Sequence, residues 1–196
     1  MSTDADSPLH LTFLQDRPLT QDAVALALER HAGQRRDADG APFLAHPLEV
    51  AALLDRAHYP DHVVASAVLH DVLEDTDAER AELDARFGPE VGELVAAVSD
   101  DLSIPGEEAR KDDVRERVHR LKGYPAAIYA ADKISKVREL RILLATGATL
   151  RDVEVRVTRY RKSLEMLDET IPGSRLVATL RFELELLEEL PPRLAT

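Results

Sequence analysis

Four polar residues in one otherwise apolar segment are the strongest candidates for chemistry in this chain. Residues 67–76 read AVLHDVLEDT, and the polar members that matter are His70, Asp71, Glu74 and Asp75. Burying an imidazole and three carboxylates among Val, Leu and Ala is costly unless a cation or a dense hydrogen-bond network compensates. A divalent metal ion is the simplest compensator, so the sequence predicts a metal site here.

The spacing of these residues fits a helix. Side chains four residues apart share a helical face, so His70 is expected beside Glu74, and Asp71 beside Asp75. The run around them is apolar on nearly all sides, which is typical of a central helix. We therefore expect a buried helix that presents all four polar groups near its end.

Two further polar residues stand at the edges of apolar segments, His46 in FLAHP and Asp132 in IYAADK. Together with His70 and Asp71 they make a ligand set of two nitrogens and two oxygens, which suits Mn²⁺, Mg²⁺ or Fe²⁺ and leaves positions open for water and a phosphate oxygen. An open cation lowers the pKa of bound water and polarises a phosphoryl oxygen, as phosphoester or pyrophosphate hydrolysis requires. An acidic pair one turn further on is placed to orient or deprotonate the attacking water.

Composition limits the classes of partner. The 196-residue chain has a formal net charge of −12, whereas a general nucleic-acid binder needs many Lys and Arg contacts to phosphates. A small anionic ligand remains compatible if a local basic cluster stands out against the acidic surface. Three such clusters are present: Arg35 with Arg36, Arg110 with Lys111, and Lys133 with Lys136.

The chain contains no Cys, so any metal must be held by imidazole and carboxylate groups, and disulfides are excluded. No apolar stretch reaches the ~18 residues of a membrane span, and the first residues are polar and acidic. We expect a cytoplasmic protein with a loose leader over residues 1–18 and one domain over residues 19–190.

Helical periodicity without any strand pattern predicts an all-α fold, a single bundle of about eight helices. Thr20 is expected to cap a first helix over about residues 20–32, Asp61 a third helix that continues through residue 75, and a capping box at Thr76 a fourth. Later boundaries are expected at Gly88 and Pro89, near residues 107, 120 and 125, at Gly147, at a capping box over residues 149–152, and at Pro172.

The ordered set of motifs resembles the HD superfamily of metal phosphohydrolases, in particular RelA/SpoT-type alarmone hydrolases and their small single-domain relatives. The likeness is carried by VLHDVLEDT at residues 68–76, His46-Pro47 and Ala131-Asp132-Lys133, and by HAGQRR at 31–36, GAPF at 40–43, RFG at 86–88, VSDD at 98–101, Arg110-Lys111, and Arg156-Val157 with Tyr160. It covers roughly residues 23 to 160.

The resemblance implies an HD-domain fold and a reaction that removes the 3′-pyrophosphate of guanosine tetra- or pentaphosphate, releasing GDP or GTP. It implies that Mn²⁺ is held by His46, His70, Asp71 and Asp132, with Glu74 and Asp75 as the catalytic acidic pair. It also implies nucleotide or phosphate contacts from Arg35, Arg36, Arg110, Lys111, Lys136, Arg156 and Tyr160.

One departure bears on the substrate. Relatives usually carry Asn where this chain has Lys136, and an ammonium group cannot accept a hydrogen bond. An NADPH phosphatase or another nucleotide phosphohydrolase is therefore a rival interpretation, and a non-catalytic alarmone-binding regulator is a second. Tyr160 also lies on an apolar stripe, so core packing is an alternative to a role at the base. For the basic pairs, the alternative is that they are solvated surface residues.

Overall fold

A computed structural model of the chain describes residues 11–189, and within that range the fold is all-α, as predicted. The elements are η1 Leu11–Leu14, α1 Pro18–Arg30, α2 Ala45–Arg56, α3 Asp61–Val68, α4 Val72–Asp75, α5 Arg80–Phe87, α6 Pro89–Val98, α7 Glu107–Leu121, α8 Gly123–Thr146, α9 Leu150–Thr170 and α10 Arg175–Glu188. Most of the expected leader, residues 1–10, lies outside the described residues, as does the predicted end of the domain at residue 190.

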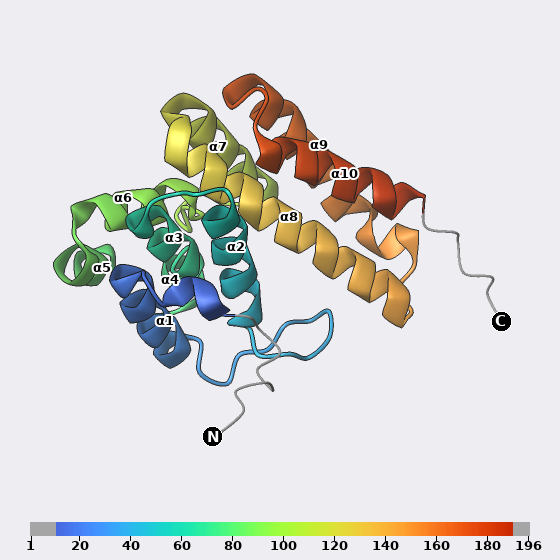
Figure 1. Cartoon of the computed structure of the whole chain (residues 1–196). Helices are drawn as coiled ribbons and strands as arrows, with labels where there is room; N and C mark the ends of the chain where they lie inside the picture. Colours follow the sequence, from blue (N-terminus) through green and yellow to red (C-terminus); the bar gives the residue numbers. More distant parts are fainter. Residues whose placement is uncertain (1–10, 190–196) are drawn as a thin grey trace.

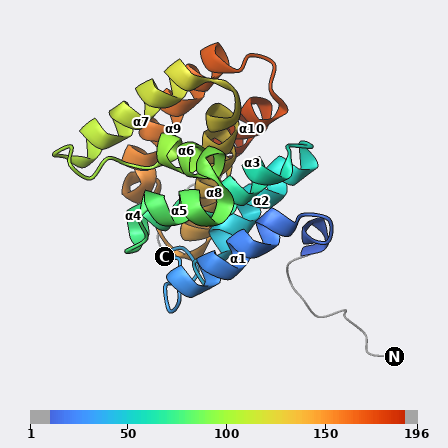
Figure 2. The same ribbon diagram turned by 90° about the vertical axis from the view of Figure 1, so that its left-hand side faces the viewer.

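Helix α8 is the element around which the others pack. It contacts α2, α3 and α6 on one side and α7, α9 and α10 on the other. Figure 1 shows it running between the group formed by α1 to α6 and the group formed by α9 and α10, and Figure 2 shows the same bundle from the side. Its residues 126–132 are all buried, so this part of the helix carries Asp132 into the interior.

Several predicted boundaries are confirmed. Helix α5 ends before Gly88, whose φ of 88° suits glycine, and Pro89 begins α6. Gly147 ends α8 in the same way, and a capping box of Thr149 and Asp152 begins α9. The local signals at these positions act through backbone conformation, which is why they could be recognised from the sequence.

Two predicted helix caps are wrong. Thr20 lies inside α1, which begins at Pro18, and its hydroxyl donates to Asp61 Oδ1 at 2.5 Å. Asp61 does not cap its own helix; its carboxylate accepts from the backbone N–H groups of Leu19 and Thr20 at 3.0 and 3.2 Å. The acid therefore satisfies the first turn of α1 across the bundle and fixes α1 against α3.

The predicted third helix is not continuous. It ends at Val68, a turn follows over residues 69–71, and the short helix α4 begins at Val72. The predicted capping box at Thr76 is also absent, because the Thr76 hydroxyl donates back to the Val72 carbonyl at 2.6 Å and α5 begins only at Arg80. The break turns His70 and Asp71 toward α2 and α8 instead of stacking them over the acidic pair.

Within residues 11–189, no helix combines the length and apolar character that crossing a bilayer requires.

Candidate metal centre and nucleotide pocket

Four side chains predicted as metal ligands converge from three parts of the bundle. His46 lies in the first turn of α2, His70 and Asp71 in the turn between α3 and α4, and Asp132 in the middle of α8. All four are at most 7% exposed. Ligand atoms of His46, His70 and Asp132 lie within 4.8 Å of one another, and the Asp71 carboxylate lies 3.2 Å from His70 Nε2 and 3.5 Å from His46 Nε2.

Hydrogen bonds on the far side of each ring direct both Nε2 atoms into this cluster. His70 Nδ1 donates to the Ala67 carbonyl at 2.8 Å. His46 Nδ1 lies 2.9 Å from the Ser135 hydroxyl, which gives its own proton to Glu49. Such outer partners fix the ring orientation of histidine ligands in metal sites.

The electrostatics favour positive charge at the point where the rings meet. Burial opposes a charge on His70, but the Asp71 and Asp132 carboxylates outweigh it and raise the pKa of His70 to about 9. Burial, supported by the Lys136 ammonium, lowers the pKa of His46 to about 4. Burial works against ionised Asp71, yet His70 and Lys136 bring its pKa down to about 2. The acids therefore stay charged in the interior.

Two carboxylate oxygens in the cluster are buried without a hydrogen-bond partner, Asp71 Oδ2 and Asp132 Oδ1. The second lies 3.2 Å from His46 Nε2. Buried ionised oxygens of this kind are rare unless they pair or coordinate a cation. The donor set consists of two imidazole nitrogens and two carboxylates, and it fits a divalent metal ion, as predicted from the sequence.

The predicted catalytic acids lie beside the cluster at different depths. Glu74 accepts a hydrogen bond from the Asp100 backbone N–H at 2.7 Å and lies 3.9 Å from Lys111 Nζ. Burial and the charge of Asp71 raise the pKa of Glu74 to about 7. Asp75 is the more exposed acid, and desolvation and Asp71 raise its pKa as well. Glu74 is placed to exchange a proton near neutral pH.

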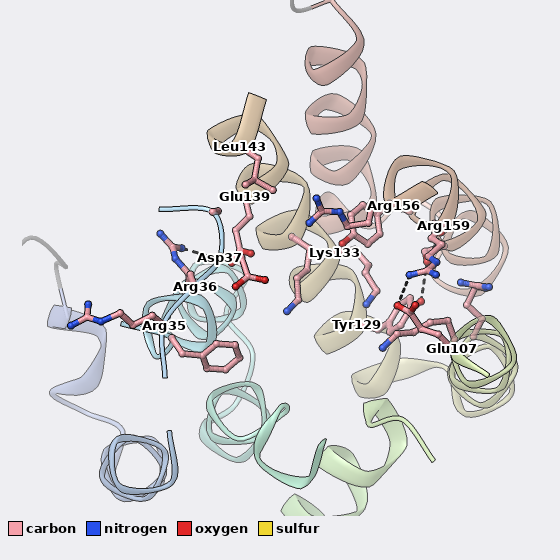
Figure 3. A pocket seen from close by; sticks show the side chains of 17 residues that line it. Arg35, Arg36, Asp37, Glu107, Tyr129, Lys133, Glu139, Leu143, Arg156 and Arg159 are labelled. Atoms are coloured by element: carbon pink, nitrogen blue, oxygen red, sulfur yellow. Dashed lines mark hydrogen bonds and ion pairs between the residues drawn. The ribbon is translucent and has the colours of Figure 1, made fainter. Parts of the chain in front are cut away.

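A cavity of about 300 Å³ opens next to the cluster, and basic side chains outnumber acidic ones around it although the whole chain is acidic. Figure 3 shows Arg35 and Arg36 on one side, Arg156 and Arg159 on the other, and Lys133 between them. The lining comprises Arg35, Arg36, Asp37, Ala38, Phe43, Glu107, Lys111, Arg115, Tyr129, Lys133, Lys136, Glu139, Leu143, Arg156, Arg159, Tyr160 and Ser163.

Most of the predicted substrate residues line this cavity, with one exception. Arg110 is absent from the lining; its guanidinium turns to Asp100 and to the Ile104 carbonyl, both at 3.4 Å. Its neighbour Lys111 lines the cavity and pairs with Asp100 at 2.9 Å. Arg35 also bonds the Gly40 carbonyl at 2.8 Å, so it shapes its own loop as well as the cavity wall.

Lys136 lies between the metal cluster and the cavity. Its Nζ is 3.9 Å from Asp71 Oδ2 and 6.0 Å from the centre of the Phe43 ring. Tyr160 lines the cavity and also packs against the core. Its contact with the base stays a prediction.

Sequence reasoning did not assign several residues that line the cavity. Lys133 is the clearest, because it belongs to the third basic cluster of the sequence but no contact with the substrate was predicted for it. Its ammonium lies 2.6 Å from Asp132 Oδ2 and 4.4 Å from the centre of the Tyr129 ring. Its position next to Asp132 was a usable signal. Arg115 and Arg159 also line the cavity, but no sequence signal distinguished them from the other arginines of their charged helices. Arg159, on α9, pairs with Glu107 of α7 at 2.6 Å.

Comparison with known proteins gives a consistent result. The HD domain family matches residues 23–175. Mouse guanosine-3′,5′-bis(diphosphate) 3′-pyrophosphohydrolase MESH1 is 36% identical over 129 residues, which cover 64% of this chain and 72% of the mouse protein. A solved structure described as a metazoan ortholog of SpoT that hydrolyses ppGpp superposes with a TM-score of 0.77 at 28% identity, covering 86% of this chain and 95% of that one.

A longer relative matches over a shorter region. GTP pyrophosphokinase rsh of Brucella ovis is 46% identical over 81 residues, which cover 41% of this chain and 11% of the Brucella protein. The chain thus spans only about a tenth of the length of that relative.

Proposed function

The chain belongs to the HD domain family, and on this basis we propose that it is a metal-dependent hydrolase that removes the 3′-pyrophosphate of (p)ppGpp, giving GDP or GTP and pyrophosphate. The observation that carries the proposal is the convergence of His46, His70, Asp71 and Asp132 beside a basic cavity. The similarity to MESH1, named as a hydrolase of this bond, supports the choice of substrate. The proposed catalytic domain spans residues 19–190, and the proposed location is the cytoplasm.

The same four residues are the proposed ligands of a divalent cation, and Mn²⁺ is the ion that we propose. Two imidazoles and two carboxylates suit this ion better than Mg²⁺, which prefers oxygen ligands, and Fe²⁺ is the remaining candidate. When bound, such a cation supplies Lewis-acid activation of water and of a phosphoryl oxygen. The negative charges of Asp71 and Asp132 balance it in the interior.

Glu74 and Asp75 are the proposed proton-handling residues. Glu74 has one oxygen fixed by the Asp100 N–H, and its pKa of about 7 lets it accept a proton from the attacking water and release it again at neutral pH. Asp75, on the last turn of α4 and more exposed, is placed to pass that proton to solvent. The water attacks the phosphorus attached to the ribose 3′ oxygen, and the bond between that phosphorus and the 3′ oxygen breaks. The 3′ oxygen of GDP or GTP takes up one proton from solvent, which replaces the proton that the attacking water gave up.

The cavity is proposed to bind the nucleotide through charge and stacking. Lys136 lies nearest to the four proposed ligands, where the scissile pyrophosphate would be placed. With Arg35 and Arg36 in the cavity lining, it is proposed to offset the charge that develops there. Lys111, Arg156 and Tyr160 line the remainder and are proposed to contact the distal phosphates and the base. Arg110 acts on this surface only through Asp100.

A second substrate is favoured by one specific observation. Lys136 brings an ammonium to within 3.9 Å of Asp71, at a position where the family resemblance implies Asn. A point charge there suits a phosphate monoester as well as a pyrophosphate, so NADPH or another nucleotide is the rival substrate.

Product analysis separates these possibilities. Purified chain supplied with Mn²⁺ is incubated with ppGpp, with NADPH and with a nucleoside monophosphate, and pyrophosphate and orthophosphate are measured separately. The proposal expects pyrophosphate from ppGpp as the fastest reaction. Orthophosphate from NADPH as the dominant product supports the rival hydrolase. Stable binding of ppGpp with no turnover of any substrate identifies a non-catalytic regulator.

A further inference from the structure

A series of hydrogen bonds begins at His46 Nδ1, on the side of the ring that faces away from the other proposed metal ligands. The ring nitrogen Nδ1 lies 2.9 Å from Ser135 Oγ, and Ser135 donates to Glu49 Oε2 at 2.7 Å. His46 and Glu49 are both on α2, one turn apart, while Ser135 is on α8, one turn beyond Asp132. His46 and Ser135 are fully buried, so no bulk water competes for the hydrogen bond between them.

The series continues to the opposite side of the bundle. Glu49 Oε1 accepts a hydrogen bond from Arg138 at 2.8 Å, and the same guanidinium donates to Glu183 Oε1 at 2.7 Å. Glu183 belongs to α10, is 5% exposed, and also pairs with Arg141 at 2.5 Å. A carboxylate buried this deeply is stable only when it is paired, so these contacts hold Glu183 and Arg138 in one arrangement.

The direction of the protons follows from the donors available. Ser135 has one hydroxyl proton, and it goes to the Glu49 carboxylate. The Ser135 oxygen can then only accept from His46, which places the neutral ring's proton on Nδ1 and leaves the Nε2 lone pair facing Asp71, Asp132 and His70. A metal ligand needs this tautomer.

We propose that Ser135 and Glu49 are positioning residues that select the metal-binding tautomer of His46, and that the Arg138–Glu183 pair anchors them to α10. The inference rests on the proposed function because it takes His46 as a ligand. Outer-shell partners of ligating histidines typically change metal affinity by about 10- to 100-fold when they are removed. Helix α10 thereby supports the metal centre, although it contributes no residue to it.

One other group competes for the same nitrogen. Glu139 Oε1 lies 3.4 Å from His46 Nδ1 and has no hydrogen-bond partner of its own. This distance is too long for a good N–H···O bond, whereas Ser135 Oγ lies only 2.9 Å from the same nitrogen. A Glu139→Gln variant therefore separates the two partners.

The test combines Mn²⁺ titration calorimetry with ¹⁵N NMR of the His46 ring in metal-free protein. Wild type is expected to show the Nδ1–H form at neutral pH. Ser135→Ala and Glu49→Gln are expected to lose the pure Nδ1–H signature and to weaken Mn²⁺ binding by about 10- to 100-fold. Glu139→Gln is expected to keep both properties.

Ser66→Ala is the matched control. Ser66 is a fully buried serine on α3 whose hydroxyl donates only to the His62 carbonyl, at 2.7 Å. It is expected to retain wild-type Mn²⁺ affinity and the wild-type His46 signature. Circular dichroism and melting curves of all variants identify any that do not fold, and Glu49→Gln provides a second probe if Ser135→Ala is among them.

The outcomes separate this inference from the proposed function. The positioning role is overturned if wild type binds Mn²⁺ and both variants, Ser135→Ala and Glu49→Gln, match it. They would have to match it in Mn²⁺ affinity and in the NMR signature of His46. If wild type binds no Mn²⁺ but the signature still changes in both variants, the hydrogen-bonded selection of the tautomer stands while the proposed metal-dependent function fails.

Discussion

The Nε2 atoms of His46 and His70 face each other at a distance of 3.2 Å in the interior of the bundle. Asp132 Oδ1 lies 3.2 Å from the first and 3.6 Å from the second, and it has no hydrogen-bond partner. Two imidazole lone pairs directed at one point repel each other unless a proton or a metal ion lies between them. This relationship is the physical basis for the predicted metal site.

Replacing one of these rings is expected to remove metal binding and turnover together. His70→Ala deletes a ligand and leaves Asp71 and Asp132 without a cation, so Mn²⁺ affinity is expected to fall by more than about 100-fold, with hydrolysis of ppGpp below detection. Calorimetry and product analysis measure the two effects. His62→Ala, at a partly exposed histidine that pairs with Glu90, is the control and is expected to retain both. Full activity in His70→Ala contradicts the site.

The raised pKa of Glu74 predicts a pH-dependent stability. The ordinary value of 4.5 rises to about 7 in the folded chain, so folded protein retains a proton that unfolded protein releases across this window. The contribution of Glu74 to the stability of metal-free protein is therefore lost as the pH rises from about 4.5 to 7. Glu74→Gln has no charge to bury and is expected to be more stable than wild type at pH 8, by up to about 3 kcal/mol.

Urea unfolding in EDTA at pH 5 and at pH 8 measures this effect. The stability gain of Glu74→Gln is expected to be small at the lower pH and large at the higher one. An equal gain at both values shows that the Glu74 carboxyl titrates normally. The same variant, supplied with Mn²⁺, is expected to lose about 10²- to 10⁴-fold in turnover, because it cannot accept a proton.

Substitution of Lys136 is expected to change substrate preference. Lys136→Asn removes the ammonium beside Asp71 and introduces an amide that can accept a hydrogen bond from the nucleotide as well as donate one. One such bond is worth about 1 kcal/mol, so kcat/KM for ppGpp relative to NADPH is expected to rise about fivefold or more. Competition assays with both substrates give this ratio directly. An unchanged ratio shows that Lys136 does not discriminate between them.

The contact between α1 and α3 predicts a stability effect remote from the site. Asp61→Ala removes the acceptor of two backbone N–H groups and of the Thr20 hydroxyl, and it is expected to destabilise the fold by roughly 2–4 kcal/mol. Asp22→Ala, which breaks the exposed pair with Arg86 at 2.6 Å, is the control and is expected to cost less than about 1 kcal/mol. Urea unfolding that shows equal costs contradicts this account of Asp61.

Local signals allowed part of this structure to be predicted. Gly88, Gly147 and the Thr149 capping box act on the backbone within a few residues, so their effects are visible in the sequence. The convergence of the four predicted ligands was anticipated from the order of the motifs, and the structure brings them together.

The features that were missed depend on contacts between distant segments. The carboxylate of Asp61 reaches across to α1, which no local pattern reveals. The turn over residues 69–71 interrupts a segment with good helical periodicity, because it directs both His70 and Asp71 to one point. Ser135 and Glu49 are ordinary helix residues until α2 and α8 are packed together.

The most direct test of the central claim is to measure the products that metal-loaded chain forms from ppGpp. Purified protein is stripped with EDTA, reloaded with Mn²⁺ and incubated with ppGpp, and GDP and pyrophosphate are quantified by ion-exchange chromatography, with Asp132→Ala in parallel. The account predicts equimolar GDP and pyrophosphate from the reloaded wild-type protein. Neither product is expected from the stripped protein or from Asp132→Ala, and adding Mn²⁺ is expected to restore both products only in the wild-type protein. Recovery of intact ppGpp from the reloaded wild-type protein, or release of orthophosphate in place of pyrophosphate, contradicts it.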